Sequence, residues 1–294
     1  MICKFCDSSH VHKAGNHNGF QSYKCLKCGK KFDGEKYKKD DNYIFHFNTR
    51  LKKTDTNRLT RDNYCVPKKE LDYRDKKNIQ MAKHFIEENN SPPLLCPSVY
   101  YNIPNSVFED EEHYTDEFVE KHYKDCMINF DLNMQYFDKL DYDKFNNYLN
   151  SFIKKNMFVE ITDLAEISDK IGAYILVLDK YKQVYIGIST SQKGIKGRIL
   201  QHWSKKKEFG RLLNGNVETS ILSIDSFGAL DTTRIFYKEL KWYQDLDKYE
   251  GKIVSEFKSE YRLNRVAGGL NAEEEGSLRN LHLLSTIQKR ELER

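Results

Sequence analysis

The sequence lacks the features that would place it in or across a membrane. None of its apolar runs reaches the length of about 18 residues that a transmembrane helix needs. The opening Met1-Ile2-Cys3-Lys4 does not begin a secretory signal either. We therefore expect an intracellular, cytoplasmic protein with no membrane partner. In that compartment the cysteines should be reduced or bound to metal rather than paired in disulfides.

The chain also has little net charge, because 48 Lys and Arg residues face 44 Asp and Glu residues, which leaves +4. The charges are nevertheless unevenly distributed along the chain. Residues 1–40 and 193–211 are basic, whereas residues 109–143 are acidic. We interpret the acidic block as a solvated face. The two basic segments favour a nucleic-acid partner, because each of them coincides with a motif described below.

Neither internal repeats nor low-complexity tracts divide the 294 residues, so the domain prediction depends on length and hydrophobic pattern. We predict four segments: a β-rich ribbon at 1–35, a linker and mostly helical middle region at 36–160, a mixed α+β domain at 165–270, and a C-terminal helix at 271–294. Within the middle region the apolar spacing predicts helices over 72–90, 115–129 and 134–155. That region carries no motif with recognisable chemistry.

The pattern within 165–270 predicts both strands and helices. Residues 171–178 and 183–189 are strands, and the short polar link 179–182 between them is typical of a hairpin. We predict further a helix over 195–208, a third strand over 217–225, one or two helices within 232–260, and a last helix over 272–291. The predicted fold class is therefore α+β.

Four cysteines near the start have the spacing of a metal site. Cys3-x2-Cys6 and Cys25-x2-Cys28 form two pairs separated by 18 residues. Each pair can direct two thiolates at one point, and Gly29 suits the sharp turn after the second pair. Four thiolates complete a closed tetrahedral site, which is typical of structural zinc. One pair alone could be a redox motif, but two pairs favour one structural Zn²⁺, whose binding supplies folding energy to a unit too small for a core.

The stretch CKFC…GFQSYKCLKCGKKF resembles the zinc ribbons at the start of some insertion-sequence transposases, and this resemblance implies a DNA-associated ribbon. Aromatic residues alternate with four lysines that suit phosphate contact: Lys24, Lys27, Lys30 and Lys31. The alternative is a ribbon that binds protein or only stabilises the N-terminus. Because four thiolates already satisfy zinc, we expect the three histidines between the pairs to be surface or backbone-contacting residues: His10, His12 and His17. The other three cysteines have no ligand spacing, and we expect them to be ordinary buried thiols: Cys65, Cys96 and Cys126.

The mixed domain carries an ordered set of polar residues. It begins with the triplet Gly172-Ala173-Tyr174 and continues with Tyr185-Ile186-Gly187. Further along the chain come three more sites: Arg198 with His202, Glu250, and Asn264. In this order residues 172–270 resemble the GIY-YIG nuclease family. Ala173 replaces the usual isoleucine with another apolar residue, and the segment from Tyr185 to Arg198 is somewhat long.

The resemblance implies a small antiparallel three-stranded sheet flanked by helices, and a site that cuts phosphodiesters. Arg198 can bind phosphate oxygens, and His202, four residues later on the same helix face, can transfer a proton. Glu250 is expected to be the protein ligand of Mg²⁺ (or Mn²⁺), which commonly uses one or two carboxylates. Asn264 either holds the site together or contacts phosphate.

Two tyrosines complete the implied site, and either could orient the attacking water or remove its proton. A phenol with a pKa of about 10 is a poor base, so we expect the cationic surroundings to lower the pKa of Tyr174 or Tyr185. Three lysines after His202 could guide the DNA backbone, although the helix dipole alone also favours cations there: Lys205, Lys206 and Lys207.

These patterns together predict a Mg²⁺-dependent DNA endonuclease, and the resemblance to the GIY-YIG family implies hydrolysis that leaves a 5′-phosphate and a 3′-hydroxyl. Restriction of, or defence against, foreign DNA is the expected role, and the alternative is a homing-type nuclease of a mobile element or phage. Two other classes stay open: a non-catalytic zinc-ribbon DNA-binding regulator, and a scaffold that binds protein through the acidic residues 109–120. A homodimer would explain cleavage of both strands by a nuclease with one site per chain.

Overall fold

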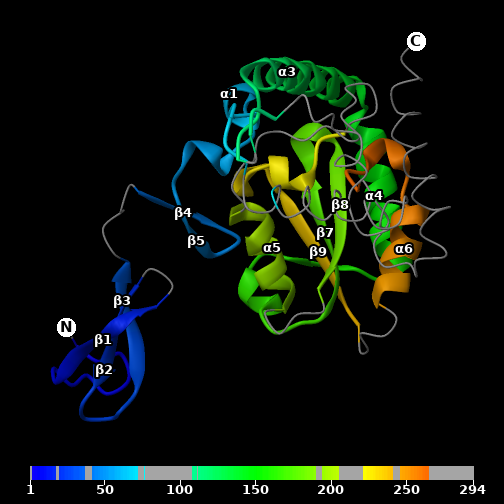
Figure 1. Cartoon of the computed structure of the whole chain (residues 1–294). Helices are drawn as coiled ribbons and strands as arrows, with labels where there is room; N and C mark the ends of the chain where they lie inside the picture. The colour runs from blue at the N-terminus through cyan, green and yellow to red at the C-terminus, as the bar shows by residue number, and fades with distance from the viewer. Residues whose placement is uncertain are drawn as a thin grey trace, which may run out of the picture. The chain divides into compact units, whose positions relative to one another are not determined.

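The computed structural model describes residues 2–17, 20–36, 42–71, 76, 108–110, 112–189, 194–204, 221–240 and 246–264. The chain divides into two compact units (Figure 1). One comprises Met1–Asp55 with Thr162–Glu166, and the other comprises Thr56–Ile161 with Ile167–Arg294. This division differs from the predicted domains, because most of the region 36–160 belongs to the same unit as the mixed domain. Near residue 160 only the short segment Thr162–Glu166 belongs to the first unit.

The first unit contains two small antiparallel sheets. Strands β1 (Val11–His17), β2 (Phe20–Cys25) and β3 (Lys31–Lys36) form a three-stranded sheet, as expected for the β-rich segment 1–35. Strands β4 (Tyr43–His46) and β5 (Thr49–Lys52) form a hairpin at the start of the region 36–160, where we predicted a linker and helices but no strand. Two residues with positive φ, Phe47 and Asn48, make its tight turn.

The second unit begins with short elements, η1 (Asp55–Asn57, which starts at the unit boundary) and α1 (Arg61–Tyr64), and continues with two long helices. Helix α3 (Asp116–Lys139) starts at Thr115, whose side chain accepts a hydrogen bond from the Phe118 amide. Helix α4 (Tyr142–Asn156) starts in the same way at Asp141. Such side-chain caps satisfy amides that have no partner within the helix. Two helices are present in this stretch, as predicted. The first was predicted to end at residue 129 but continues for ten more residues, because Phe130 and Phe137 extend its buried face.

A four-stranded antiparallel sheet forms the centre of this unit, with the strand order β6-β9-β7-β8. Strand β7 (Gly172–Leu178) pairs with β8 (Gln183–Ser189), and the 3-10 turn η5 (Asp179–Tyr181) joins them. The predicted hairpin is thus confirmed. The coarse fold class is confirmed as well, since small antiparallel sheets and helices make up the described chain.

The other two strands correct the prediction of a three-stranded sheet. Strand β9 (Arg234–Glu239) pairs with β7 on one side and with β6 (Val159–Ile161) on the other. We predicted helix at β9 and placed the third strand at 217–225, of which the described part, from 221 onward, carries the 3-10 turn η7 (Ile224–Ser226) instead. Pairing explains the difference: β7 needs a partner on its second edge, and the β-branched and aromatic residues of β9 suit that place.

Helices and short turns cover the sheet. All seven residues of β7 are buried, so both faces of the strand are covered. On one face, the core includes residues of β7, of α4 and of α6 (Leu246–Glu256): Ala173, Ile175 and Val177; Phe145, Leu149 and Phe152; Ile253 and Val254. Helix α5 (Gly194–Ser204) lies on the other side of the sheet from α4 and α6 (Figure 1). Three 3-10 turns complete the unit: η4 (Leu164–Ile167, which begins in the first unit), η8 (Ala229–Asp231) and η10 (Ser259–Tyr261).

Within the described residues, no helix combines the length and the apolar character that crossing a bilayer requires. The predicted helices over 72–90 and 272–291 lie outside the described residues, apart from Lys76, and Cys96 lies outside them too.

The packing of α4 against the sheet predicts that substitutions in α4 destabilise the whole second unit. Leu149 is fully buried in the shared core, so Leu149→Ala should lower the free energy of unfolding by about 2–5 kcal/mol. The measurement is urea denaturation followed by tryptophan fluorescence, to which Trp203 on α5 contributes. Ser151→Ala, an exposed change on the same helix, should cost less than about 0.5 kcal/mol. A Leu149→Ala chain with an unchanged fluorescence transition would contradict the shared core.

Candidate functional site

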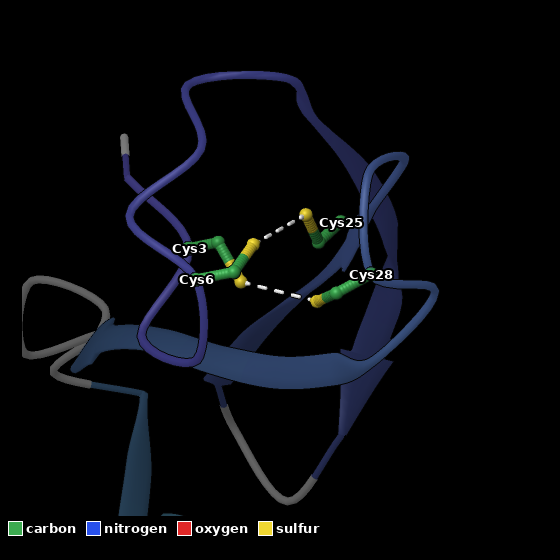
Figure 2. Close-up of side chains that lie close together, drawn as sticks. All are labelled: Cys3, Cys6, Cys25 and Cys28. Atoms are coloured by element: carbon green, nitrogen blue, oxygen red, sulfur yellow. Dashed lines mark hydrogen bonds between the residues drawn. The ribbon is translucent and has the colours of Figure 1, made fainter.

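The four N-terminal cysteines converge on one point (Figure 2). Their sulfur atoms all lie within 4.8 Å of one another. Cys3 Sγ is 3.6 Å from Cys28 Sγ, and Cys6 Sγ is 3.6 Å from Cys25 Sγ. These separations are far longer than a disulfide bond of about 2.05 Å. They are close to the roughly 3.8 Å that separates sulfurs in a zinc tetrahedron with Zn–S bonds of about 2.3 Å. The four thiols could therefore bind one zinc ion.

Two matching turns present these thiols. After each Cys-x2-Cys pair, a residue with positive φ donates its amide to the carbonyl of the first cysteine of the pair. Asp7 (φ 55°) donates to Cys3 at 3.0 Å, and Gly29 (φ 71°) donates to Cys25 at 2.9 Å. Asp tolerates the left-handed conformation better than most side chains do, and Gly has no side chain to oppose it. The turn predicted at Gly29 is confirmed, and Asp7 makes the equivalent turn in the first pair.

The other described cysteines and histidines are not members of this cluster. Cys65 and Cys126 are buried, as predicted, and neither forms a disulfide, whereas His10 and His12 are exposed. Among the described residues, the four-cysteine cluster is the only group of three or more His, Cys, Asp or Glu side chains that could hold a metal ion.

The geometry of the cysteine cluster predicts that zinc content depends on Cys25. Cys25→Ser replaces a thiolate ligand by a hydroxyl, so the purified chain should lose its one equivalent of zinc, as measured by elemental mass spectrometry. Cys65→Ser is the matched control, because that thiol is buried elsewhere, and the variant should retain zinc. Full zinc content in Cys25→Ser would contradict the proposed ligand set.

The ribbon displays its lysines on the surface. The four predicted phosphate contacts, Lys24, Lys27, Lys30 and Lys31, are all exposed. Lys24 and Lys31 are direct partners across β2 and β3, and like charges in this position repel each other. Lys30 lies over the exposed ring of Phe5, with 4.8 Å between Nζ and the ring centroid. An anionic partner would relieve this repulsion, so the surface suits a polyanion.

In the second unit, the register of β7 and β8 brings the two tyrosines together. Tyr174 is paired with Gly187, and Tyr185 lies two residues before Gly187, so both phenols are on the same face of the sheet. Their ring centroids are 6.3 Å apart. Tyr174 is fully buried beneath α5. The intervening Ile186 faces the opposite side, where it joins the core with α4 and α6.

Glycines at two positions make this arrangement possible. A Cβ atom on Gly187 would lie 2.5 Å from Tyr174 Oη and 3.0 Å from Tyr185 Cε1, so a side chain there would displace the phenols. Gly172 has φ of 147°, and a Cβ atom there would collide with the Lys238 carbonyl of β9. The glycines of the two triplets thus provide space for the tyrosines and for the central strand pairing.

Helix α5 covers the tyrosines with a buried stripe. Ile195, Ile199 and His202 are buried at helical spacing, and Arg198 is exposed one turn before His202. His202 Nε2 lies 2.9 Å from Tyr174 Oη, and the His202 ring centroid lies 5.0 Å from that of Tyr185. Arg198 donates to Gln201 Oε1 at 2.6 Å. The helix therefore places an imidazole against the phenols and a guanidinium at the surface beside them.

A residue that the sequence analysis did not single out completes this group. The Asp225 carboxylate, in η7, lies 2.8 Å from His202 Nδ1. Ser223 Oγ accepts the backbone amide of Asp225, which fixes the turn. No motif in the sequence marks Asp225, because the contact joins residues 23 positions apart through a short irregular segment.

Charged groups also act on both phenols. Burial raises the pKa of Tyr174 well above its usual value, and the neighbouring Tyr185 and Glu250 add to this rise, whereas Arg198 opposes it. Burial likewise raises the pKa of Tyr185, with Glu250 again adding and Arg198 again opposing. The expectation that cationic surroundings lower the tyrosine pKa is therefore wrong, because burial outweighs Arg198. Glu250 itself is 9% exposed on α6, close enough for its charge to affect both rings.

Asn264 holds the edge of the sheet. Its Nδ2 donates to the Ile186 carbonyl at 2.7 Å, and its Oδ1 accepts the Ile186 amide at 3.0 Å. The preceding Leu263 amide donates to Val184 of β8 at 2.8 Å. Of the two roles considered for Asn264, the structure displays the first: it fixes β8 at the residue between Tyr185 and Gly187. Lys205, Lys206 and Lys207 lie outside the described residues.

The raised pKa values of Tyr174 and Tyr185 predict a loss of stability at alkaline pH. Below about pH 10 a phenol is protonated in both the folded and the unfolded chain, so it adds no pH dependence. Above about pH 10 the unfolded chain releases phenol protons that the folded chain keeps, because the folded pKa values of Tyr174 and Tyr185 are raised. The free energy of unfolding should therefore fall as the pH rises further.

Urea denaturation between about pH 8 and pH 11 measures how steeply the free energy of unfolding falls with pH. Tyr185→Phe should make the alkaline loss of stability shallower. Tyr142→Phe, at an exposed position on α4, controls for removal of a hydroxyl. If the free energy of unfolding fell equally steeply with pH in the wild type and in Tyr185→Phe, a raised pKa of Tyr185 in the folded chain would be contradicted.

Comparison of the chain with protein-family models, with curated proteins and with solved structures finds no match.

Proposed function

We propose that this protein is a Mg²⁺-dependent DNA endonuclease of the GIY-YIG type. The observation that carries the proposal is the 2.9 Å contact between the Tyr174 hydroxyl and His202 Nε2. The charges of Arg198 and Glu250, which both act on the same phenol, support it. These groups come from a strand and two helices that are distant in the sequence. Their convergence supports a shared chemical task better than it supports independent packing roles.

Each group suits one requirement of phosphodiester hydrolysis. The exposed Arg198 guanidinium can bind two oxygens of a phosphate and stabilise its extra negative charge. The imidazole of His202 can accept or donate a proton during the reaction. Tyr174 and Tyr185 hold their protons at neutral pH, because burial raises the pKa of each. They can therefore orient a water molecule, but a free phenolate is not populated.

Glu250 is the residue that would hold the metal ion. Its carboxylate is almost buried yet acts on two phenols, so the site offers oxygen atoms, the ligands that Mg²⁺ prefers. A bound Mg²⁺ would neutralise charge that develops on the phosphate and acidify a coordinated water. No ligand other than Glu250 is required from the protein, since Mg²⁺ keeps several waters.

DNA is the substrate that the ribbon favours. Its exposed lysines include Lys24 and Lys31, which repel each other across two strands unless an anion lies between them. We propose that the ribbon binds zinc and then contacts the DNA backbone, while the second unit hydrolyses the bond to leave a 5′-phosphate. Restriction of foreign DNA is the role we propose. The alternative is a homing-type nuclease. It would be favoured if digestion of a randomised DNA pool produced cut ends that all map to one long, rare target sequence.

The test is plasmid nicking by the purified full-length chain with and without Mg²⁺. Glu250→Gln keeps the size of the side chain but removes the negative charge that holds the cation, so its cleavage rate should fall at least about 100-fold. Glu256→Gln is the matched control on the same helix. Glu256 makes a surface ion pair with Lys155 at 3.1 Å, so this change should leave the rate within about threefold.

The outcomes separate the enzyme from the alternatives. Mg²⁺-dependent nicking by the wild type that is lost in Glu250→Gln alone supports the endonuclease. DNA binding without nicking in any metal would contradict it and favour the non-catalytic regulator. Equal nicking by the wild type and Glu250→Gln would contradict the role of Glu250 and point to a contaminating nuclease.

A further inference from the structure

His202 has a partner on each of its ring nitrogens. Nε2 lies 2.9 Å from the Tyr174 hydroxyl, and Nδ1 lies 2.8 Å from Asp225 Oδ1. The His202 side chain is 6% exposed and that of Asp225 is 26% exposed. The imidazole is thus held between a fully buried phenol and a carboxylate that reaches the surface.

The carboxylate determines which nitrogen carries the hydrogen. An ionised carboxylate only accepts hydrogen bonds, so Nδ1 of His202 must donate to Asp225. In the neutral imidazole the other nitrogen, Nε2, then has no hydrogen and is an acceptor. The Tyr174 hydroxyl therefore donates to Nε2. The two hydrogen bonds therefore run in the same direction: Tyr174 donates to His202, and His202 donates to Asp225.

We propose that Asp225 is a positioning residue that makes His202 the proton acceptor for Tyr174 during the proposed hydrolysis. This inference depends on the proposed function. The attacking water gives one proton to the Tyr174 oxygen while the original Tyr174 proton moves to His202 Nε2. The water oxygen forms a bond to phosphorus, the bond from phosphorus to the 3′-oxygen breaks, and that oxygen takes a proton from solvent. The imidazolium later releases its proton to the hydroxide that remains.

This relay explains how a buried tyrosine can assist the reaction. Burial raises the pKa of Tyr174 well above its usual value, so Tyr174 cannot act by first losing its proton to solvent. In the relay the phenol gains one proton as it loses another and never carries a full negative charge. The positive charge appears on His202 instead, where the Asp225 carboxylate faces it at 2.8 Å and stabilises it.

The other charged and titratable groups around His202 are consistent with this assignment. Tyr185 of β8 faces the imidazole with ring centroids 5.0 Å apart, and Arg198 lies one turn earlier on α5. Glu250 of α6 acts on the two phenols. Asp225 is the one carboxylate for which the described residues record a hydrogen bond to His202.

Asp225→Asn in the full-length chain tests the role of the carboxylate. The asparagine amide can donate to Nδ1, which moves the hydrogen to Nε2 and prevents His202 from accepting the Tyr174 proton. In plasmid nicking with Mg²⁺, kcat should fall by roughly 10²–10⁴-fold, with KM within about threefold.

Two further variants separate positioning from folding. Asp225→Glu keeps the carboxylate and should recover a substantial part of the rate that Asp225→Asn loses. Ser223→Ala removes the hydroxyl that caps the turn at Asp225 and should leave kcat within about threefold. A loss in Ser223→Ala as large as that in Asp225→Asn would overturn the proposal, because loosening of the turn would then explain both.

A spectroscopic readout is independent of activity. Long-range ¹H–¹⁵N correlation of the imidazoles, with His202 assigned by its absence in His202→Gln, reports which nitrogen is protonated. The wild type should have the hydrogen on Nδ1, and Asp225→Asn should have it on Nε2. A wild-type imidazole with its hydrogen on Nε2, or an Asp225→Asn chain that cuts DNA at the wild-type rate, would overturn the relay. A wild-type chain that cuts no DNA would contradict the proposed function itself.

Discussion

The hydrogen bond between Tyr174 and His202 joins the central strand to α5, and the rest of the site depends on it. Both groups are buried, so either of them left without a partner would cost about 1–3 kcal/mol. The need to keep this hydrogen bond fixes the rotation of α5 about its own axis. Arg198, four residues earlier on the same helix face, then emerges beside the phenols at the surface. Gly187 is part of the same constraint, because a Cβ atom there would collide with the Tyr174 hydroxyl.

The parts of the fold that the sequence predicts are those whose pattern is local. The β7–β8 hairpin follows from two apolar runs joined by a four-residue polar link, and the ribbon follows from the spacing of its cysteines. The parts that were missed depend on distant contacts. Strand β9 has a mixed pattern that becomes a strand because β7 needs a second partner, and α4 belongs with the sheet because Phe145 and Leu149 fill its core. Neither requirement is visible within a short window.

The same distinction applies to the candidate site. The residues drawn from the motif, such as Tyr174 and His202, could be named from the sequence because their order and spacing are specific. Asp225 could not be named from the sequence, because a single aspartate in a 3-10 turn belongs to no sequence motif. Its contact with His202 arises only from the fold. The direction of the tyrosine pKa shift was also missed, because composition indicates the nearby cations but not that burial outweighs them.

The most direct test of the convergence of these groups is a crystal structure of the chain soaked with Mn²⁺, with the ion located by anomalous scattering. We predict an ion about 2.1 Å from a Glu250 carboxylate oxygen, in the space bordered by Tyr174, Tyr185 and the Arg198 guanidinium. A Glu250 side chain directed away from the two phenols, with no ion near them at a saturating Mn²⁺ concentration, would contradict the proposed site.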